Sequence, residues 1–199
     1  MMTVCIFAAV TIGAVAGYLF IPESFMASVN SSTTMVLCFL VFLVGLEIGS
    51  NRAILRQVKG QGGFLIIIPI CTIMGSLFGG VLSGIILRLP MNLSLSISSG
   101  LGWSSLSGVL LTQLDSAEMG AVAFLSNVFR MVLTVIFIPI IAKYLNDYTT
   151  IAPAAATSMD TTLPVISQNT RPEIVPISLL NGVLLSTLVP ILVPFFYSL

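Results

Sequence analysis

Long apolar runs alternate with two interrupted segments along this chain. The uninterrupted runs lie at residues 2–20, 33–51, 63–88, 119–145 and 173–196. The hydrocarbon core of a bilayer is about 30 Å thick and needs about 20 apolar residues per helix, so each run is long enough to cross it. The pattern therefore predicts five continuous transmembrane helices.

The two interrupted segments, residues 92–113 and 151–168, are too polar for lipid-facing helices. The first is rich in serine and glycine, and we expect it to break near residues 100–103; the second contains two prolines and Asp160. Paired broken helices are typical of substrate sites in secondary transporters. The alternative is that small residues only let helices pack closely. The predicted fold is an all-α, polytopic transmembrane bundle of about seven passes, two of them discontinuous, like secondary transporters built from inverted repeats.

The composition supports a membrane protein, because 57% of the residues are hydrophobic and 7% are charged, against about 25% charged in soluble domains. Seven acidic and seven basic residues balance, and nothing suggests nucleic acid as a partner. The connector at residues 51–59 carries three of the basic residues, which places it and the amino terminus in the cytoplasm. Residues 1–199 are read as one transporter domain, with a three-helix part at residues 1–90 and the broken helices and the site at residues 91–199.

Three ionisable groups lie well inside predicted spans: Glu47, Arg130 and Asp160. A lone aspartate at the bilayer centre costs roughly 2.5 to 3.5 kcal/mol, so such residues face a cavity, a partner or a solute. Asp160 either pairs with Arg130 as a structural ion pair or alternates between Arg130, a proton and a cationic substrate. Glu47 either reaches water from its helix end or attracts cations at the inner mouth.

Further candidates for substrate or ion binding share one property: they lie in the broken segments or carry a side-chain amide inside a span. Asn127 shares a helix face with Arg130, and Asn181 with Gly182 is expected to interrupt the last span. For both amides the alternative is a hydrogen bond between helices. Backbone amides near Gly102 and Thr157 are candidates for holding a substrate carboxylate. The full set is Gly100, Gly102, Trp103, Ser104, Ser105, Ser107, Asn127, Thr157, Ser158, Thr161 and Asn181.

Enzyme chemistry finds little support in the sequence. The chain contains no histidine, so a serine–histidine pair is excluded, and an aspartyl dyad would need Glu47 beside Asp160. Cys5, Cys38 and Cys71 each lie in an apolar run and are expected to be buried thiols rather than metal ligands or a disulfide. No cofactor and no metal is expected.

Three blocks in order, at residues 99–108, 123–130 and 156–165, resemble the LysO-type lysine exporter family, and the resemblance covers nearly the whole chain. It implies an inner-membrane exporter of L-lysine and close analogues, driven by a gradient of protons or sodium. Ornithine or arginine as the substrate, and a membrane subunit that does not transport alone, stay open as alternatives.

The resemblance also implies a partner, because family members often carry about three further spans at the amino end. This chain is expected to pair with a separate small subunit or to form a homodimer. It departs from the family pattern where Ser104, Met131 and Asn181 replace the usual Tyr, Glu and His. The change at Met131 removes a membrane acid and leaves Asp160 and Glu47 as candidates for binding an ammonium group or a coupling ion.

Overall fold

The computed structural model describes residues 64–199 together with Met35, Phe39 and Phe42. The chain divides into two compact units, residues 1–43 and 44–199, and every element discussed below belongs to the second. All regular secondary structure in the described part of the chain is helical, which confirms the all-α prediction there. Glu47, the predicted run at residues 2–20 and all of the run at residues 33–51 except Met35, Phe39 and Phe42 lie outside the described residues.

Three long helices have the length and composition of membrane spans: α4 (Phe64–Leu87), α7 (Ala117–Tyr144) and α10 (Ile174–Tyr197). They contain 24, 28 and 24 residues. At 1.5 Å per residue they are about 36 to 42 Å long, enough to cross a bilayer. Their bounds agree with the last three runs predicted from the sequence. The expected interruption of the last run at Asn181 and Gly182 is wrong, because α10 continues through both residues.

The two interrupted segments form short helical pieces. Their bounds are α5 (Met91–Ser98), α6 (Ser104–Leu114), η1 (Asp147–Thr150), α8 (Ile151–Ala154), η2 (Ala155–Met159) and α9 (Leu163–Asn169). The first segment breaks at residues 99–103, as predicted, and the second leaves the α-helical conformation between Ala155 and Thr162. Both segments are therefore discontinuous.

The two ends of each interrupted segment lie close together. Asn92 Nδ2 donates to the backbone oxygen of Tyr197 at 3.1 Å, and the Tyr197 hydroxyl donates to Asp115 Oδ1, also at 3.1 Å. Both ends of the first segment are thus held at the carboxyl end of α10. At the other end of α10, Arg171 Nε forms an ion pair with Asp147 Oδ2 at 2.7 Å, which joins the two ends of the second segment.

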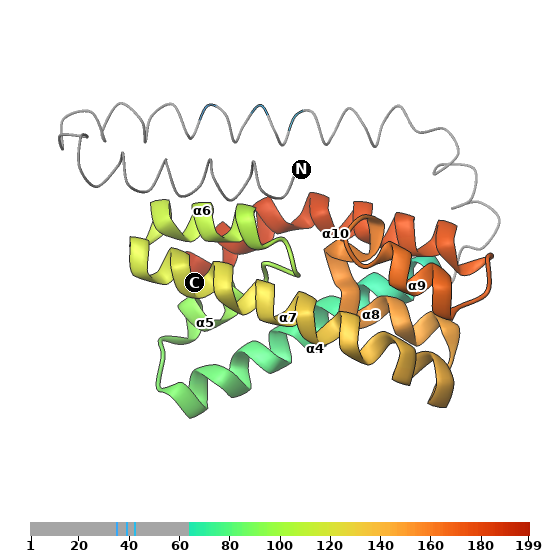
Figure 1. Ribbon diagram of the computed structural model, residues 1–199. Coiled ribbons are helices and arrows are strands. Elements are labelled where there is room, and N and C mark those ends of the chain that lie inside the picture. Colours follow the sequence, from blue (N-terminus) through green and yellow to red (C-terminus); the bar gives the residue numbers. More distant parts are fainter. Residues whose placement is uncertain (1–34, 36–38, 40–41, 43–63) are drawn as a thin grey trace, which may run out of the picture. The chain divides into compact units, whose positions relative to one another are not determined.

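Each interrupted segment therefore enters and returns on the same side. We call residues 91–115 the first hairpin and residues 147–171 the second hairpin. Figure 1 shows the first hairpin at the left, the second at the right, and α10 running between them. The prediction of seven passes is not confirmed, because the described residues contain three span-length helices and two hairpins that turn back.

The second hairpin packs into a core shared with all three long helices. This core joins side chains from α4, α7, α8, α9 and α10: Ile68, Ile138, Ile151, Ala154, Ile166, Ile174, Ile177 and Leu180. Most of them are fully buried. Because apolar contact anchors both arms of the second hairpin, its polar tip is held at a fixed depth between the long helices.

Candidate functional site

The tips of the two hairpins meet. The backbone amide of Ala156 donates to the backbone oxygen of Leu101 at 3.0 Å. Leu101, Gly102 and Ala155 have positive φ angles of 47°, 93° and 50°, and all three residues are buried. A non-glycine residue in this region costs about 1 to 2 kcal/mol, so the surrounding contacts must hold the tips in place.

Asn127 of α7 holds the tip of the first hairpin. Its Oδ1 accepts from the Gly102 amide at 2.7 Å, and its Nδ2 donates to Ser107 Oγ at 3.1 Å and to the Ala123 backbone oxygen at 2.9 Å. Gly100 allows this approach, because a Cβ there would lie 2.5 Å from Asn127 Nδ2. The interhelical role foreseen for this amide is observed, and the Gly102 amide is already occupied.

Asn181 of α10 holds the tip of the second hairpin. Its Nδ2 donates to the Ala155 backbone oxygen at 3.2 Å and to Ser158 Oγ at 3.1 Å. Ser158 and Ser178 exchange two hydrogen bonds, each hydroxyl donating to the other residue's backbone oxygen at 2.8 Å. Asn181 Oδ1 is buried without a partner among the described residues. Each tip is thus held by one asparagine from a long helix.

Side chains from α4 and α7 satisfy the last backbone oxygens of α8. Thr72 Oγ1 donates to the Ala152 oxygen at 3.4 Å, and Thr134 Oγ1 donates to the Pro153 oxygen at 3.0 Å. Arg130 Nε donates to the same Pro153 oxygen at 3.3 Å. These carbonyls have no partner within a helix that ends at Ala154, so the contacts stabilise the break.

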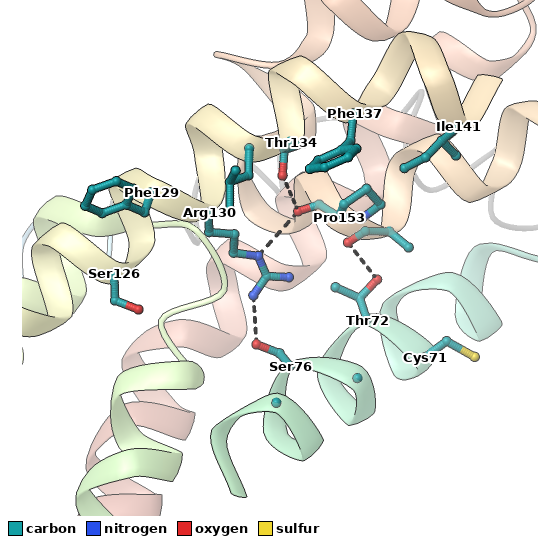
Figure 2. Close-up of a pocket in the computed structure, with 14 residues that line it drawn as sticks. Cys71, Thr72, Ser76, Ser126, Phe129, Arg130, Thr134, Phe137, Ile141 and Pro153 are labelled. Carbon is teal, nitrogen blue, oxygen red and sulfur yellow. Dashed lines mark hydrogen bonds between the residues drawn. The ribbon is translucent and has the colours of Figure 1, made fainter. Parts of the chain in front are cut away.

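Arg130 lies between two cavities. The large cavity, of about 860 Å³, is bounded by α4, α7 and α8, and the small cavity, of about 250 Å³, by α4, α5 and α7. Ser76, Gly79, Ser126 and Arg130 line both. Figure 2 shows the guanidinium extending from α7 toward α4, where Nη1 donates to Ser76 Oγ at 2.7 Å. The described residues that line the two cavities include no acid.

Asp160 lines neither of these cavities. It is exposed between η2 and α9, and its carboxylate accepts from the neighbouring Thr161 amide. The ion pair considered between Arg130 and Asp160 is not formed: the described part of the chain contains one ion pair, between Asp147 and Arg171. The hydrogen bonds of Arg130 direct its guanidinium to Ser76 and Pro153 instead.

The other sequence candidates divide by burial. Ser107, Thr157, Ser158, Gly100 and Gly102 are buried at the two tips, Trp103 and Ser104 are half-buried, and Ser105 and Thr161 are exposed. Trp103 lines neither cavity. The hairpin tips therefore collect the buried candidates, whereas Asp160, Thr161 and Ser105 face outward.

Sequence reasoning missed Thr72 and Ser76. They lie four residues apart in an apolar helix, and this spacing, which puts two hydroxyls on one face, was the available signal. The prediction for Cys71 was wrong, because this free thiol is exposed and lines the large cavity. An apolar run in a membrane helix does not by itself distinguish a protein-packed position from one facing lipid or a cavity.

Comparisons with known proteins agree with the resemblance. The sequence model of the lysine exporter LysO family matches residues 7–197. The "Lysine exporter LysO" of Escherichia coli strain K12 is 36% identical over 174 residues, which cover 87% of this chain and 57% of that protein. A "Putative lysine exporter" of Haemophilus influenzae is 35% identical over 190 residues, which cover 96% of this chain and 95% of that protein. No solved structure matches. The chain belongs to the lysine exporter LysO family.

Proposed function

We propose that this chain exports L-lysine, and close cationic analogues, across the bacterial inner membrane by ion-coupled antiport. The observation that carries the proposal is the meeting of two hairpin tips at the Ala156–Leu101 hydrogen bond. Broken backbone between packed helices supplies polar groups at membrane depth, where a transporter holds its solute. Membership of a family of lysine exporters supplies the substrate class.

The orientation follows from charge. Lys143 and Arg171 lie at the end where α10 begins, and Arg88 lies at the opposite end, after α4. Together with the basic connector at residues 51–59, this distribution favours the cytoplasm for the end that carries the second hairpin. The second hairpin then enters from the cytoplasm, and the first hairpin enters from outside.

In the proposed cycle, a cationic amino acid arrives from the cytoplasm and its ammonium group binds Asp160, the exposed acid of the second hairpin. A proton or a sodium ion arriving from outside competes for the same carboxylate and releases the substrate. One positive charge replaces another, so the carboxylate is never left uncompensated in the membrane. Glu47 serves as a second acid near the cytoplasmic mouth.

Replacing the carboxylate tests this assignment. Asp160→Asn should abolish export of labelled lysine while leaving the amount of protein in the membrane unchanged, and Asp160→Glu should retain part of the activity. Asp147→Asn is a matched control, because it removes an acid of the same hairpin whose role is an ion pair at the surface. Normal export by Asp160→Asn would refute the assignment.

A second candidate function is that of a subunit that needs a partner. The chain spans 57% of the length of the E. coli relative and 95% of the H. influenzae relative, so a part of the first has no counterpart in the matched region. The partner would be a separate small membrane subunit or a second copy of this chain. Uptake of labelled lysine into inverted vesicles that contain this chain alone would establish an autonomous carrier; uptake only after co-expression of a small membrane protein would establish a subunit.

A further inference from the structure

We infer that Arg130 binds the carboxylate of the exported amino acid and that the large cavity receives its side chain. This inference rests on the proposed function and deepens it, because it identifies the group that distinguishes an amino acid from a simple amine. It starts from the position of Arg130 near the middle of α7, on the wall shared by both cavities.

The guanidinium has unused hydrogen-bonding capacity. Arginine carries five N–H donors in a fixed fork. One on Nε bonds the Pro153 oxygen and one on Nη1 bonds Ser76 Oγ. The other three, including both on Nη2, have no acceptor in the part of the chain that the structure describes. Because both partners are neutral, the described residues hydrogen-bond the guanidinium but do not balance its positive charge.

The local charge favours an anion. Among residues 64–199, no acid lines either cavity, and Arg130 is the charged residue of both linings. A guanidinium away from bulk water requires a counter-charge or extensive hydrogen bonding. A carboxylate matches the arginine fork with two parallel hydrogen bonds, a geometry that a lone amine cannot provide.

Other sources of a carboxylate or an anion site fit less well. Asp160 is exposed and accepts from the Thr161 amide, and it does not pair with Arg130. The Gly102 amide, a sequence candidate for holding the substrate carboxylate, already donates to Asn127. These contacts leave Arg130 as the available anion-binding group beside the hairpin tips.

The large cavity suits the rest of the substrate. Its volume of about 860 Å³ lies in the range of small-molecule sites. On the α7 side it is lined by Phe129, Leu133 and Phe137, whose side chains are 67%, 49% and 47% exposed, so the cavity is an open groove with an apolar wall. The aliphatic chain of lysine can lie along this wall while its carboxylate reaches Arg130. This is a position on the transport path separate from Asp160, which lines neither cavity.

Competition experiments test the inference with the full chain in inverted membrane vesicles. Uptake of labelled lysine is measured against unlabelled lysine, aminocaproate, which keeps the carboxylate, and cadaverine, which lacks it. In the wild type, lysine and aminocaproate should compete at least about 10-fold better than cadaverine. In Arg130→Gln, the KM for lysine should rise about 10- to 150-fold, and the three compounds should compete about equally.

Two variants separate carboxylate binding from a structural role. Thr134→Val removes a hydrogen bond to the same Pro153 oxygen without removing a charge, so it should leave the preference for carboxylates intact. Arg130→Lys keeps the charge without the fork and should restore part of the preference lost in Arg130→Gln. Retained preference in Arg130→Gln, or equal loss in Thr134→Val, would overturn the inference. Recovery of preference on adding Glu47→Gln to Arg130→Gln would assign the guanidinium to Glu47 and would also overturn it.

The inference can fail separately from the proposed function. If lysine is exported and the preference is independent of Arg130, the function stands and the carboxylate site is refuted. If the wild type transports no lysine, thermal unfolding of the purified full chain tests whether the carboxylate site exists. If aminocaproate but not cadaverine stabilises the wild type, and Arg130→Gln loses this stabilisation, a carboxylate site is supported. If aminocaproate stabilises the wild type and Arg130→Gln equally, the carboxylate site is refuted.

Discussion

A methyl group added at Gly182 should push the tip of the second hairpin away from α10. An ideal Cβ at Gly182 would lie 2.6 Å from both the backbone nitrogen and the Cβ of Met159. Carbon atoms pack at about 3.5 to 4.0 Å, and rotation of the Met159 side chain does not move its backbone nitrogen. Overpacking of this kind costs about 1 to 3 kcal/mol, so Gly182→Ala should be clearly destabilising.

Gly75 of α4 provides the matched control. A Cβ there would meet no atom of the described residues within 4 Å, so Gly75→Ala should be neutral or should gain up to about 1 kcal/mol from helix propensity. Thermal unfolding of the purified variants in one detergent would measure the order, with Gly182→Ala below the wild type and Gly75→Ala at or above it. If Gly182→Ala unfolds at or above the temperature of Gly75→Ala, the close packing of Met159 on α10 is refuted.

Two further predictions concern the ends of the hairpins. The pKa of Asp147 is lowered, and the largest cause of this shift is the side-chain hydrogen bond from Arg171. The ion pair therefore stabilises the fold at pH values above the unfolded pKa of about 3.9. This stabilisation is lost as the pH falls through the lower pKa of the folded state. The melting difference between the wild type and Arg171→Ala should therefore be constant from pH 7 to 5 and shrink below about pH 4; a difference that grows on acidification would contradict it. In a cysteine-free background, single cysteines that replace Asp147 and Arg171 should both react with an impermeant maleimide added on the same side of the membrane. A cysteine that replaces Asp115 should react with the maleimide added on the opposite side. Labelling of positions 147 and 171 from opposite sides would show that the second segment crosses the membrane.

The sequence was sufficient to locate the elements but not their direction. Apolar length predicted α4, α7 and α10 to within a few residues, and glycine and serine content predicted the break at residues 99–103. A polar segment indicates where backbone groups must be hydrogen-bonded inside the protein. Its polarity is the same whether the segment crosses the membrane or turns back to the same side. The return of the first hairpin depends on Tyr197 contacting Asp115, 82 residues away, which no local pattern encodes.

The candidate site shows the same division. Arg130 was identified because a charge is rare in an apolar run, yet its acceptors come from Ser76, 54 residues earlier, and Pro153, 23 residues later. The sequence offered Asp160 as a partner because opposite charges attract. Among the described residues, the guanidinium instead has neutral partners, the Ser76 hydroxyl of α4 and the Pro153 carbonyl of α8, which bind it without bringing a second ion into the membrane.

The contacts that hold each tip to its long helix outnumber those that hold the tips to each other. Between residues 99–103 and 155–159, the described chain contributes one hydrogen bond, from Ala156 to Leu101, worth about 0.5 to 1.5 kcal/mol net. The clamp made by Asn127 bonds Gly102, Ser107 and Ala123, and the clamp made by Asn181 bonds Ala155 and Ser158. Counted by hydrogen bonds, each tip is therefore attached more firmly to its own long helix than to the other tip.

The two clamps should differ in strength. Asn127→Leu leaves the buried Gly102 amide without its acceptor, at about 1 to 3 kcal/mol. Asn181→Leu also leaves the Ala155 backbone oxygen without its donor. It removes, however, the buried Asn181 Oδ1, which has no partner among the described residues, so part of the cost is offset. Thermal unfolding should therefore rank Asn127→Leu as the less stable variant. The reverse order would mean that Asn181 Oδ1 has an acceptor role in the intact membrane protein, and that the second tip, rather than the first, is the more firmly held.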